Sequence, residues 1–289
     1  MSNTETTLDR RLNAYRADLA DAALKGQVEV ARFVEGTPAR LAVPVAALRP
    51  RPDLAAGIDT ELLLGEDVIV FERADGFAWV KAKADGYVGY LPETALSGAE
   101  TALTHQVVVP RTFVYPGPDL RFPVSSALSM GSRFTVVGEA ETRGTCYHLL
   151  ADGRAIVASH CLPVGSWPDD DYVAIAARFL ETPYLWGGRS GFGIDCSGLV
   201  QLSLQMTGRG APRDSDMQAA SLGAVISRDE LRRGDLVFWK GHAGIMEDER
   251  TLLHANGHTM TVAREDFEAA VKRIGWLYDM PTGYRRPVA

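Results

Sequence analysis

Cysteine is scarce in this chain, with three among 289 residues, and an odd number of cysteines does not suggest a disulfide framework. Long apolar runs are missing as well, because stretches such as 41–48 are short and broken by proline and cannot span a bilayer. The first seven residues are polar and acidic and lack the basic and apolar regions of a secretory signal. These absences predict a reduced cytoplasmic protein. A periplasmic protein is the alternative, because a leader that had been removed would not be visible.

An excess of positive charge is also missing. The 30 basic residues are outnumbered by 37 acidic ones, which gives a net charge of −7, and the chain contains no basic block. We therefore expect neither a nucleic-acid nor a membrane partner. What is present, 46% hydrophobic and 23% charged residues, is typical of a globular protein, and the length suits two or three domains.

Short β-branched runs separated by Gly, Pro and Asp turns follow a lead-in segment, and they predict a small antiparallel barrel. The pattern then repeats, since Val43-Pro44 recurs as Val109-Pro110, 66 residues further on, and other landmarks recur at the same offset. We expect two tandem barrels of one type at 36–103 and 104–165, each with its own core. The lead-in, residues 1–35, is predicted to be a helical or irregular arm, because apolar side chains recur there at helical spacing.

The pattern of the chain changes again after the second barrel. Residues 169–181 predict a helix, because three leading acids suit the positive end of a helix dipole and apolar residues follow on one face. Residues 166–289 then mix helices and strands. They predict an α+β unit with the size of a catalytic domain.

One cysteine stands where a nucleophile would be activated. Four glycines precede Asp195, and an apolar helix then begins at Cys196 and ends at Gly208. Asp195 is placed to cap this helix, and Cys196 falls in its first turn, where free N–H groups and the helix dipole favour a thiolate. A buried cysteine without chemistry is the alternative reading.

Two histidines are predicted to lie together on a hairpin. If the turn is centred near Asp248, His242 and His254 face each other directly across the two strands. One imidazole can then accept the thiol proton while the other orients it. A zinc site built from the cysteine and both histidines is the alternative. No CxxC-type spacing accompanies them, so we expect no metal.

In combination, these motifs resemble the NlpC family of papain-like cysteine peptidases, which act on bacterial cell-wall peptides. The resemblance rests on Asp195-Cys196-Ser197-Gly198 after Trp186-Gly187-Gly188, on Gly241-His242-Ala243-Gly244-Ile245 and on His254. The two barrels resemble bacterial SH3 (SH3b) domains, which commonly precede this catalytic domain. The resemblance implies an α+β protein with a papain-like catalytic domain behind two small all-β SH3-like barrels.

The resemblance also implies a mechanism without a cofactor. Cys196 would attack an amide carbonyl, His242 would be the base and His254 would orient His242. Water would then hydrolyse the acyl-enzyme. The backbone N–H of Cys196, at the helix start, is a reasonable oxyanion donor, and the Tyr184 hydroxyl would help position the substrate.

The subgroup with two SH3b domains is similar to dipeptidyl-peptidases that release L-Ala-γ-D-Glu from free stem peptides, so the expected partner is a murein tripeptide or a related stem peptide. The free α-amine of such a peptide needs a fixed negative charge. Asp195 and Glu66 are the candidates, with Tyr87 of the first barrel beside them. The alternatives are a helix cap for Asp195, a solvated glutamate and a core tyrosine.

By the same resemblance, Ser197, Asp214 and Ser215 would also contact substrate. Ser215 could instead form a capping box with Gln218.

The second barrel holds another group of residues that could bind a metal. Cys146, His148, His160 and Cys161 flank a predicted hairpin turn. Strand alternation points His160 and Cys161 in opposite directions, so we expect neither a metal site nor a disulfide here.

The leading hypothesis is thus a cytoplasmic peptidase that cuts the γ-D-Glu–diamino acid bond of free murein peptides during cell-wall recycling. Three alternatives stay open. The first is a periplasmic endopeptidase on intact peptidoglycan with the barrels as wall anchors. The second is a non-catalytic wall-binding protein. The third is acyl transfer to an amine in place of water.

Overall fold

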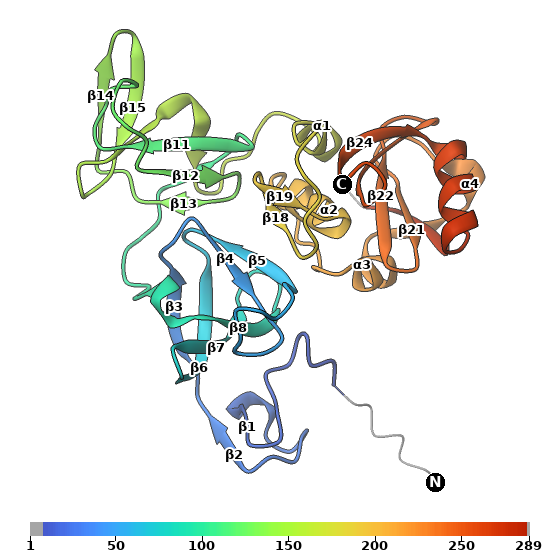
Figure 1. Ribbon diagram of the computed structural model, residues 1–289, viewed down its shortest axis with the longest axis horizontal. Helices are drawn as coiled ribbons and strands as arrows, with labels where there is room; N and C mark the ends of the chain where they lie inside the picture. The colour runs from blue at the N-terminus through green and yellow to red at the C-terminus, as the bar shows by residue number, and fades with distance from the viewer. Residues whose placement is uncertain (1–7, 288–289) are drawn as a thin grey trace. The chain divides into compact units, whose positions relative to one another are not determined.

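The computed structural model describes residues 8–287, and the chain divides into two compact units after Thr101 (Figure 1). Residues 1–7, whose polar character entered the prediction of location, lie outside the described residues, as do the last two. Among residues 8–287, no helix is both long and apolar enough to cross a bilayer.

The first unit contains an antiparallel barrel. Its five-stranded sheet has the order β8-β7-β6-β3-β9, and β4 and β5 form a separate hairpin. The elements are β3 (Thr37–Leu41), β4 (Val45–Leu48), β5 (Thr60–Leu63), β6 (Asp67–Ala74), β7 (Phe77–Ala82), β8 (Val88–Pro92), the 3₁₀ turn η2 (Glu93–Ala95) and β9 (Leu96–Ser97).

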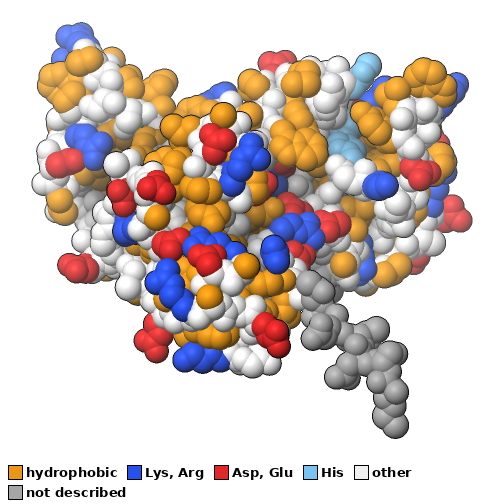
Figure 2. Space-filling view, turned by 60° about the horizontal axis from the view of Figure 1, so that its bottom comes forward, with side chains coloured by type: hydrophobic (Ala, Val, Ile, Leu, Met, Phe, Trp, Pro, Cys, Tyr) orange, Lys and Arg blue, Asp and Glu red, His pale blue; other side chains and the backbone are white. Residues whose placement is uncertain are grey.

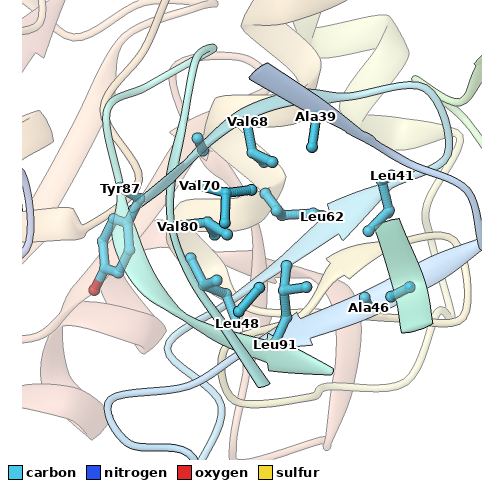
Figure 3. Packing of buried hydrophobic residues seen from close by; sticks show 13 residues of the cluster. Ala39, Leu41, Ala46, Leu48, Leu62, Val68, Val70, Val80, Tyr87 and Leu91 are labelled. Atoms are coloured by element: carbon cyan, nitrogen blue, oxygen red, sulfur yellow. The ribbon is translucent and has the colours of Figure 1, made fainter. Parts of the chain in front are cut away.

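The barrel encloses its own apolar core. Figure 3 shows Leu48, Val70 and Val80 directed toward one another, while the hydroxyl of Tyr87 points away from the other labelled side chains. Buried apolar area supplies the main stabilisation of so small a domain. The ring of Tyr87 contributes to this core, and its hydroxyl is directed outward.

The helical alternative for the N-terminal arm is wrong. Residues 8–35 form two short parallel strands and a 3₁₀ turn: β1 (Leu19–Asp21), η1 (Ala22–Leu24) and β2 (Arg32–Val34). Leu19, which the helical spacing relied on, packs instead with Phe71 and Trp79 of the barrel. Packing onto the barrel therefore overrides the local periodicity.

The second barrel resembles the first, and its first hairpin has the same register. In the first copy Val45 pairs with Leu63, and in the second Arg111 pairs with Ser129, with both partners shifted by 66 residues. Its elements are β10 (His105–Val107), β11 (Arg111–Tyr115), β12 (Ser126–Ser129), β13 (Arg133–Phe134), β14 (Gly138–Thr142), β15 (Thr145–Leu149), β16 (Ala155–Val157), η3 (Ala158–His160) and β17 (Cys161–Pro163).

The remainder of the second unit is built on a six-stranded antiparallel sheet with the order β20-β25-β21-β22-β23-β24. Helix α2 packs against β22 and β23, and α4 lies on the opposite side of the sheet (Figure 1). The elements are α1 (Tyr172–Ala177), β18 (Arg189–Ser190), β19 (Gly193–Ile194), α2 (Cys196–Gln205), α3 (Ser215–Ser221), β20 (Ala224–Ile226), η4 (Arg228–Glu230), β21 (Leu236–Trp239), β22 (His242–Met246), β23 (Thr251–Asn256), β24 (Thr261–Asp266), α4 (Phe267–Leu277) and β25 (Gly283–Arg286).

The helix predicted over 169–181 is shorter than expected. It begins at Tyr172, where Asp171 caps it by accepting a hydrogen bond from the Ala174 N–H at 2.7 Å. Glu181 has a left-handed backbone, with φ of 64°, which a continuing helix does not allow. The cap was visible in the sequence, but the early end was not.

Residues 104–165 and 166–289, predicted as separate domains, belong to one compact unit. The Gly191 N–H donates to Ser129 Oγ at 2.9 Å, and the Arg111 guanidinium donates to Gly191 O at 3.0 Å. A Cβ at position 191 would lie 2.0 Å from the carbonyl oxygen of Pro110. The second barrel therefore contacts the α+β region at a point where only glycine fits.

Candidate active site

Cys196 is the first residue of α2. Asp195 is the N-cap, and its Oδ1 accepts a hydrogen bond from the Gly198 N–H at 2.7 Å. The predicted cap and the predicted place of the cysteine are both confirmed. A Cβ at Gly198 would lie 2.4 Å from the Gly188 carbonyl oxygen, so the glycine-rich segment closes directly against the start of this helix.

The Asp195 carboxylate is held by a buried arginine. Arg213, 1% exposed, donates from Nη1 to Oδ1 at 3.0 Å and from Nη2 to Oδ2 at 2.7 Å. The Gly187 N–H donates to the same carboxylate at 2.9 Å. Its charge is therefore compensated inside the protein. A second role for Asp195, toward a substrate amine, stays a prediction and would have to compete with Arg213.

His242 and His254 are not direct cross-strand neighbours as predicted. The observed register pairs Ile245 with Leu253 and Met246 with Leu252, which displaces the two histidines by two positions. The reason is the turn. Asp248 Oδ1 accepts hydrogen bonds from two following backbone N–H groups, which centres the hairpin one residue later than assumed.

The two histidines nevertheless meet, because a displacement of two residues keeps them on the same face of the sheet. His242 Nε2 lies 2.9 Å from His254 Nδ1. Gly244 lies close to His254. A Cβ at this glycine would lie 2.7 Å from Leu252 Cδ1 and 3.4 Å from His254 Cβ, so a side chain there would crowd both residues. On the face that Figure 2 shows, histidine side chains (pale blue) are visible at the surface.

Two further residues extend this pair, and the sequence did not indicate them. His254 Nε2 lies 3.2 Å from Glu265 Oε2, and Arg273 donates from Nε to Glu265 Oε1 at 2.9 Å. Glu265 comes from β24 and Arg273 from α4. The sequence showed an acidic residue on a strand in which polar and apolar residues alternate. It did not predict the register that brings Glu265 beside His254.

Burial favours the neutral forms of Cys196 and of His242, the expected base. Burial, with the nearby Asp195 charge, raises the pKa of Cys196 to about 12, against an opposing hydrogen bond from the Ala243 backbone. Burial, with His254 beside it, lowers the pKa of His242 to about 3. Burial therefore opposes the thiolate that the helix dipole favours. The thiol must lose its proton during attack.

Acid should destabilise the protein through these histidines. Burial lowers the pKa of His242 from 6.5 to about 3 and also lowers that of His254, so the folded state stays neutral where the unfolded state binds protons. Stability is full above about pH 6.5 and falls as the pH drops toward 3, by about 1.4 kcal/mol per pH unit for His242, and His254 acts in the same direction. Urea unfolding at pH 7, 5.5 and 4.5 measures this slope. We expect His254→Gln to flatten the slope, and an unchanged slope would contradict the assignment.

Tyr184 lies close enough to the cysteine for the two to interact electrostatically. Burial raises the pKa of its hydroxyl, and the neighbouring Cys196 and Asp195 raise it further. The Tyr184 N–H donates to Met260 O at 2.8 Å, which fixes the backbone beside β24. A neutral hydroxyl at this place suits hydrogen bonding to a substrate.

Comparisons with known proteins identify the family of the region that contains Cys196, His242 and His254. Residues 181–274 match the NlpC/P60 family, and residues 48–96 match the bacterial dipeptidyl-peptidase SH3 domain. This chain carries an NlpC/P60 domain. The family is one of cysteine peptidases, so the resemblance and the α+β fold inferred from the sequence are confirmed.

Three curated relatives resemble this NlpC/P60 protein over most of its length. A gamma-D-glutamyl-L-lysine dipeptidyl-peptidase of Bacillus subtilis is 29% identical over 68% of this chain and 72% of its own. A protein of that name from Bacillus cereus is 27% identical over 65% of this chain, which spans 61% of that relative. Dipeptidyl-peptidase 6 of Lysinibacillus sphaericus is 26% identical over 81% of this chain and 97% of its own.

A solved structure shares the fold. An NlpC/P60 family protein from Bacillus cereus superposes with a TM-score of 0.72 at 22% identity, covering 88% of this chain and 100% of its own. At that identity the likeness establishes the fold alone.

Three more predicted substrate residues lie near the start of α2 or on α3. Ser197 Oγ accepts a hydrogen bond from Arg213 Nη1 at 2.9 Å. Asp214 is the N-cap residue of α3, and Ser215 is its first residue. The capping box between Ser215 and Gln218 is absent, because the Gln218 amide donates instead to the carbonyl oxygen of Ser197 at 2.9 Å. Substrate contact by Ser197, Asp214 and Ser215 stays a prediction.

Glu66 and Tyr87 belong to the first unit. Glu66 is 9% exposed, and its Oε2 accepts a hydrogen bond from the Leu63 N–H at 2.9 Å across the turn at Gly65, whose φ is 84°. The ring of Tyr87 packs in the barrel core. Their predicted contact with a substrate amine stays a prediction.

The four residues of the second barrel do not converge. Cys146 is exposed, whereas Cys161 is buried and donates to Val157 O. The His160 ring nitrogen Nδ1 lies 2.8 Å from Thr112 Oγ1. His148 packs against His105, with ring centroids 4.5 Å apart and ring planes tilted by 48°. Within residues 8–287 no group of three or more His, Cys, Asp and Glu side chains could hold a metal ion.

Proposed function

We propose that this protein hydrolyses the γ-D-Glu–diamino acid bond of free murein peptides that begin with L-Ala. The observation that carries the proposal is the bonded pair of His242 and His254, with the backbone of Ala243, next to His242, hydrogen-bonded to Cys196 at a helix start. The substrate class is supported by the names of the three relatives, each a dipeptidyl-peptidase. The SH3 match supports the same subgroup.

The proposed reaction starts from a neutral Cys196 thiol and a neutral His242 imidazole. His242 accepts the thiol proton as the Cys196 sulfur bonds to the γ-carbonyl carbon of D-Glu, and the carbonyl oxygen becomes an oxyanion near the Cys196 N–H. The C–N bond then breaks, and the leaving amine takes the proton from His242. Water attacks the thioester, gives a proton to His242 and releases L-Ala-γ-D-Glu with the thiol restored.

A substrate series tests the proposal. L-Ala-γ-D-Glu-diaminopimelate and its lysine counterpart should be cleaved to L-Ala-γ-D-Glu, measured by chromatography of the released dipeptide. N-acetylation of the alanine should remove cleavage, because an amide carries no positive charge for an acidic subsite. Equal cleavage of the acetylated peptide would overturn the free-peptide assignment.

Glu66→Gln should weaken recognition of the amine. We expect KM for the tripeptide to rise about 10- to 100-fold, the cost of losing a charge-assisted hydrogen bond, with kcat little changed. Tyr87→Phe should act in the same direction and more weakly. The control is Glu35→Gln, an exposed glutamate of the same unit. An unchanged KM in Glu66→Gln would remove the first barrel from the binding site.

An endopeptidase acting on intact peptidoglycan is the second candidate. It is favoured by the probable endopeptidase NlpC of Escherichia coli, 39% identical over 26% of this chain and 53% of its own. Cleavage of crosslinked or acetylated stems would select it. The cytoplasmic location stays a prediction, and cell fractionation with a periplasmic marker tests it.

A further inference from the structure

A series of polar side chains in contact with one another extends beyond Cys196, His242 and His254, the three residues expected to act as nucleophile, base and orienting residue. It crosses three neighbouring strands diagonally, from His242 on β22 to His254 on β23 and Glu265 on β24. Glu265 pairs with Leu252, so it shares a face with His254. Helix α4 covers this face and contributes Arg273.

Glu265 determines which nitrogen atoms of His254 and His242 donate hydrogen bonds and which accept them. Both Glu265 oxygens accept from Arg273, at 2.9 Å and 2.5 Å, and an ionised carboxylate has no proton to donate. His254 Nε2 faces this carboxylate at 3.2 Å, so the N–H of the neutral ring belongs on Nε2. His254 Nδ1 is then an acceptor.

The same rule fixes the tautomer of the base. With His254 Nδ1 as acceptor, the hydrogen bond of 2.9 Å requires His242 Nε2 to carry the proton. His242 Nδ1 is then left without a proton. An unprotonated ring nitrogen is what a general base for the thiol needs.

We propose that Glu265 is a positioning residue that sets the tautomers of both histidines and keeps His242 Nδ1 free to accept the proton of Cys196. The inference rests on the proposed peptidase function for its kinetic consequence only. The side chain of Glu265 is bonded to His254 and Arg273, so Glu265 acts on His242 through His254.

The surroundings of Glu265 keep it charged. Although burial opposes it, hydrogen bonds to His254 and Arg273 lower the pKa of Glu265 to about 2. The groups that face His254 are His242 on β22, Glu265 on β24, Arg273 on α4 and His258 beyond β23. Glu265 also lines a surface hollow with charged residues of both signs: Asp248, Glu249, Arg250, Arg264 and Asp266. The carboxylate therefore stays an acceptor wherever the enzyme is folded and the histidines are neutral.

Nitrogen NMR of the full-length protein tests the tautomers without any turnover. In a long-range ¹H–¹⁵N spectrum at pH 7, Nε2 of both His242 and His254 should have the shift of a protonated nitrogen, and both Nδ1 atoms that of an unprotonated one. Signals are assigned with His→Gln variants. The opposite pattern in the wild-type protein would overturn the proposal, and no variant has to fold for this result.

Variants test the kinetic consequence. Glu265→Met removes the acceptor at nearly constant length, and we expect kcat to fall about 10- to 100-fold with KM within about twofold. Glu265→Gln keeps an acceptor oxygen and should lose much less. Glu247→Met is the matched control, because Glu247, in the turn between β22 and β23, forms an ion pair with Arg264 of β24 and, among the described residues, with no histidine.

The outcomes separate this inference from the proposed function. Equal kcat losses in Glu265→Met and Glu247→Met, or an unchanged nitrogen spectrum in Glu265→Met, would show a structural role only. If the wild-type protein cleaves none of the peptides but the spectrum shows the expected tautomers, which Glu265→Met disturbs, the proposed function fails and this inference stands.

Discussion

Cys196→Ala should abolish hydrolysis of L-Ala-γ-D-Glu-diaminopimelate, with kcat reduced on the order of 10⁴-fold or more. The reason is that no other described group can replace the sulfur as the atom that bonds to the carbonyl carbon. His242 and His254 remain in place in this variant, but a base without a nucleophile gives little catalysis. Release of L-Ala-γ-D-Glu with excess enzyme, followed over hours, measures the residual rate.

A second buried cysteine provides the control. Burial raises the pKa of Cys161 to about 12, as it does for Cys196. Cys161 donates to the carbonyl oxygen of Val157 and belongs to the second barrel. Cys161→Ala should therefore keep its turnover. Full activity in Cys196→Ala would refute the assigned nucleophile, whatever the substrate.

Arg213→Met should destabilise the protein by about 3–5 kcal/mol, the cost of leaving one member of a buried ion pair without its partner. Arg213 is 1% exposed and donates two hydrogen bonds to Asp195, one to Ser197 and one to the carbonyl oxygen of Gly188. Methionine fills a similar volume but leaves the Asp195 charge uncompensated at the start of α2. Urea unfolding followed by circular dichroism gives the free energy.

Two comparisons test the reason for this loss. Arg228→Met breaks an exposed pair with Glu268 and should cost at most about 1 kcal/mol. Asp195→Asn in the Arg213→Met background should recover part of the loss, because asparagine still caps the helix but carries no charge. A similar cost for Arg213→Met and Arg228→Met would show that the Asp195 charge reaches solvent.

The local features of the active site could be predicted from the sequence. Asp195 caps α2 and Cys196 lies in its first turn, because capping and helix periodicity depend on residues within a few positions of each other. The repeat at 66 residues predicted a second barrel of the same type, and the first hairpin of each copy has the same pairing at that offset. His242 and His254 were placed on one face, because strand alternation survives an even displacement.

Features that depend on long-range packing were decided by the tertiary structure. The turn at Asp248 shifted the hairpin register, and the register of β24 brought Glu265 to His254. Burial of the site raises the pKa of Cys196 and lowers that of His242, although the helix dipole alone favours a thiolate.

The sequence by itself placed Cys196 at a helix start and the two histidines on one face of neighbouring strands, because these positions follow from short-range pattern. The tertiary structure alone decided their protonation and the partners Arg213, Glu265 and Arg273, because charge and desolvation depend on which distant side chains are buried together.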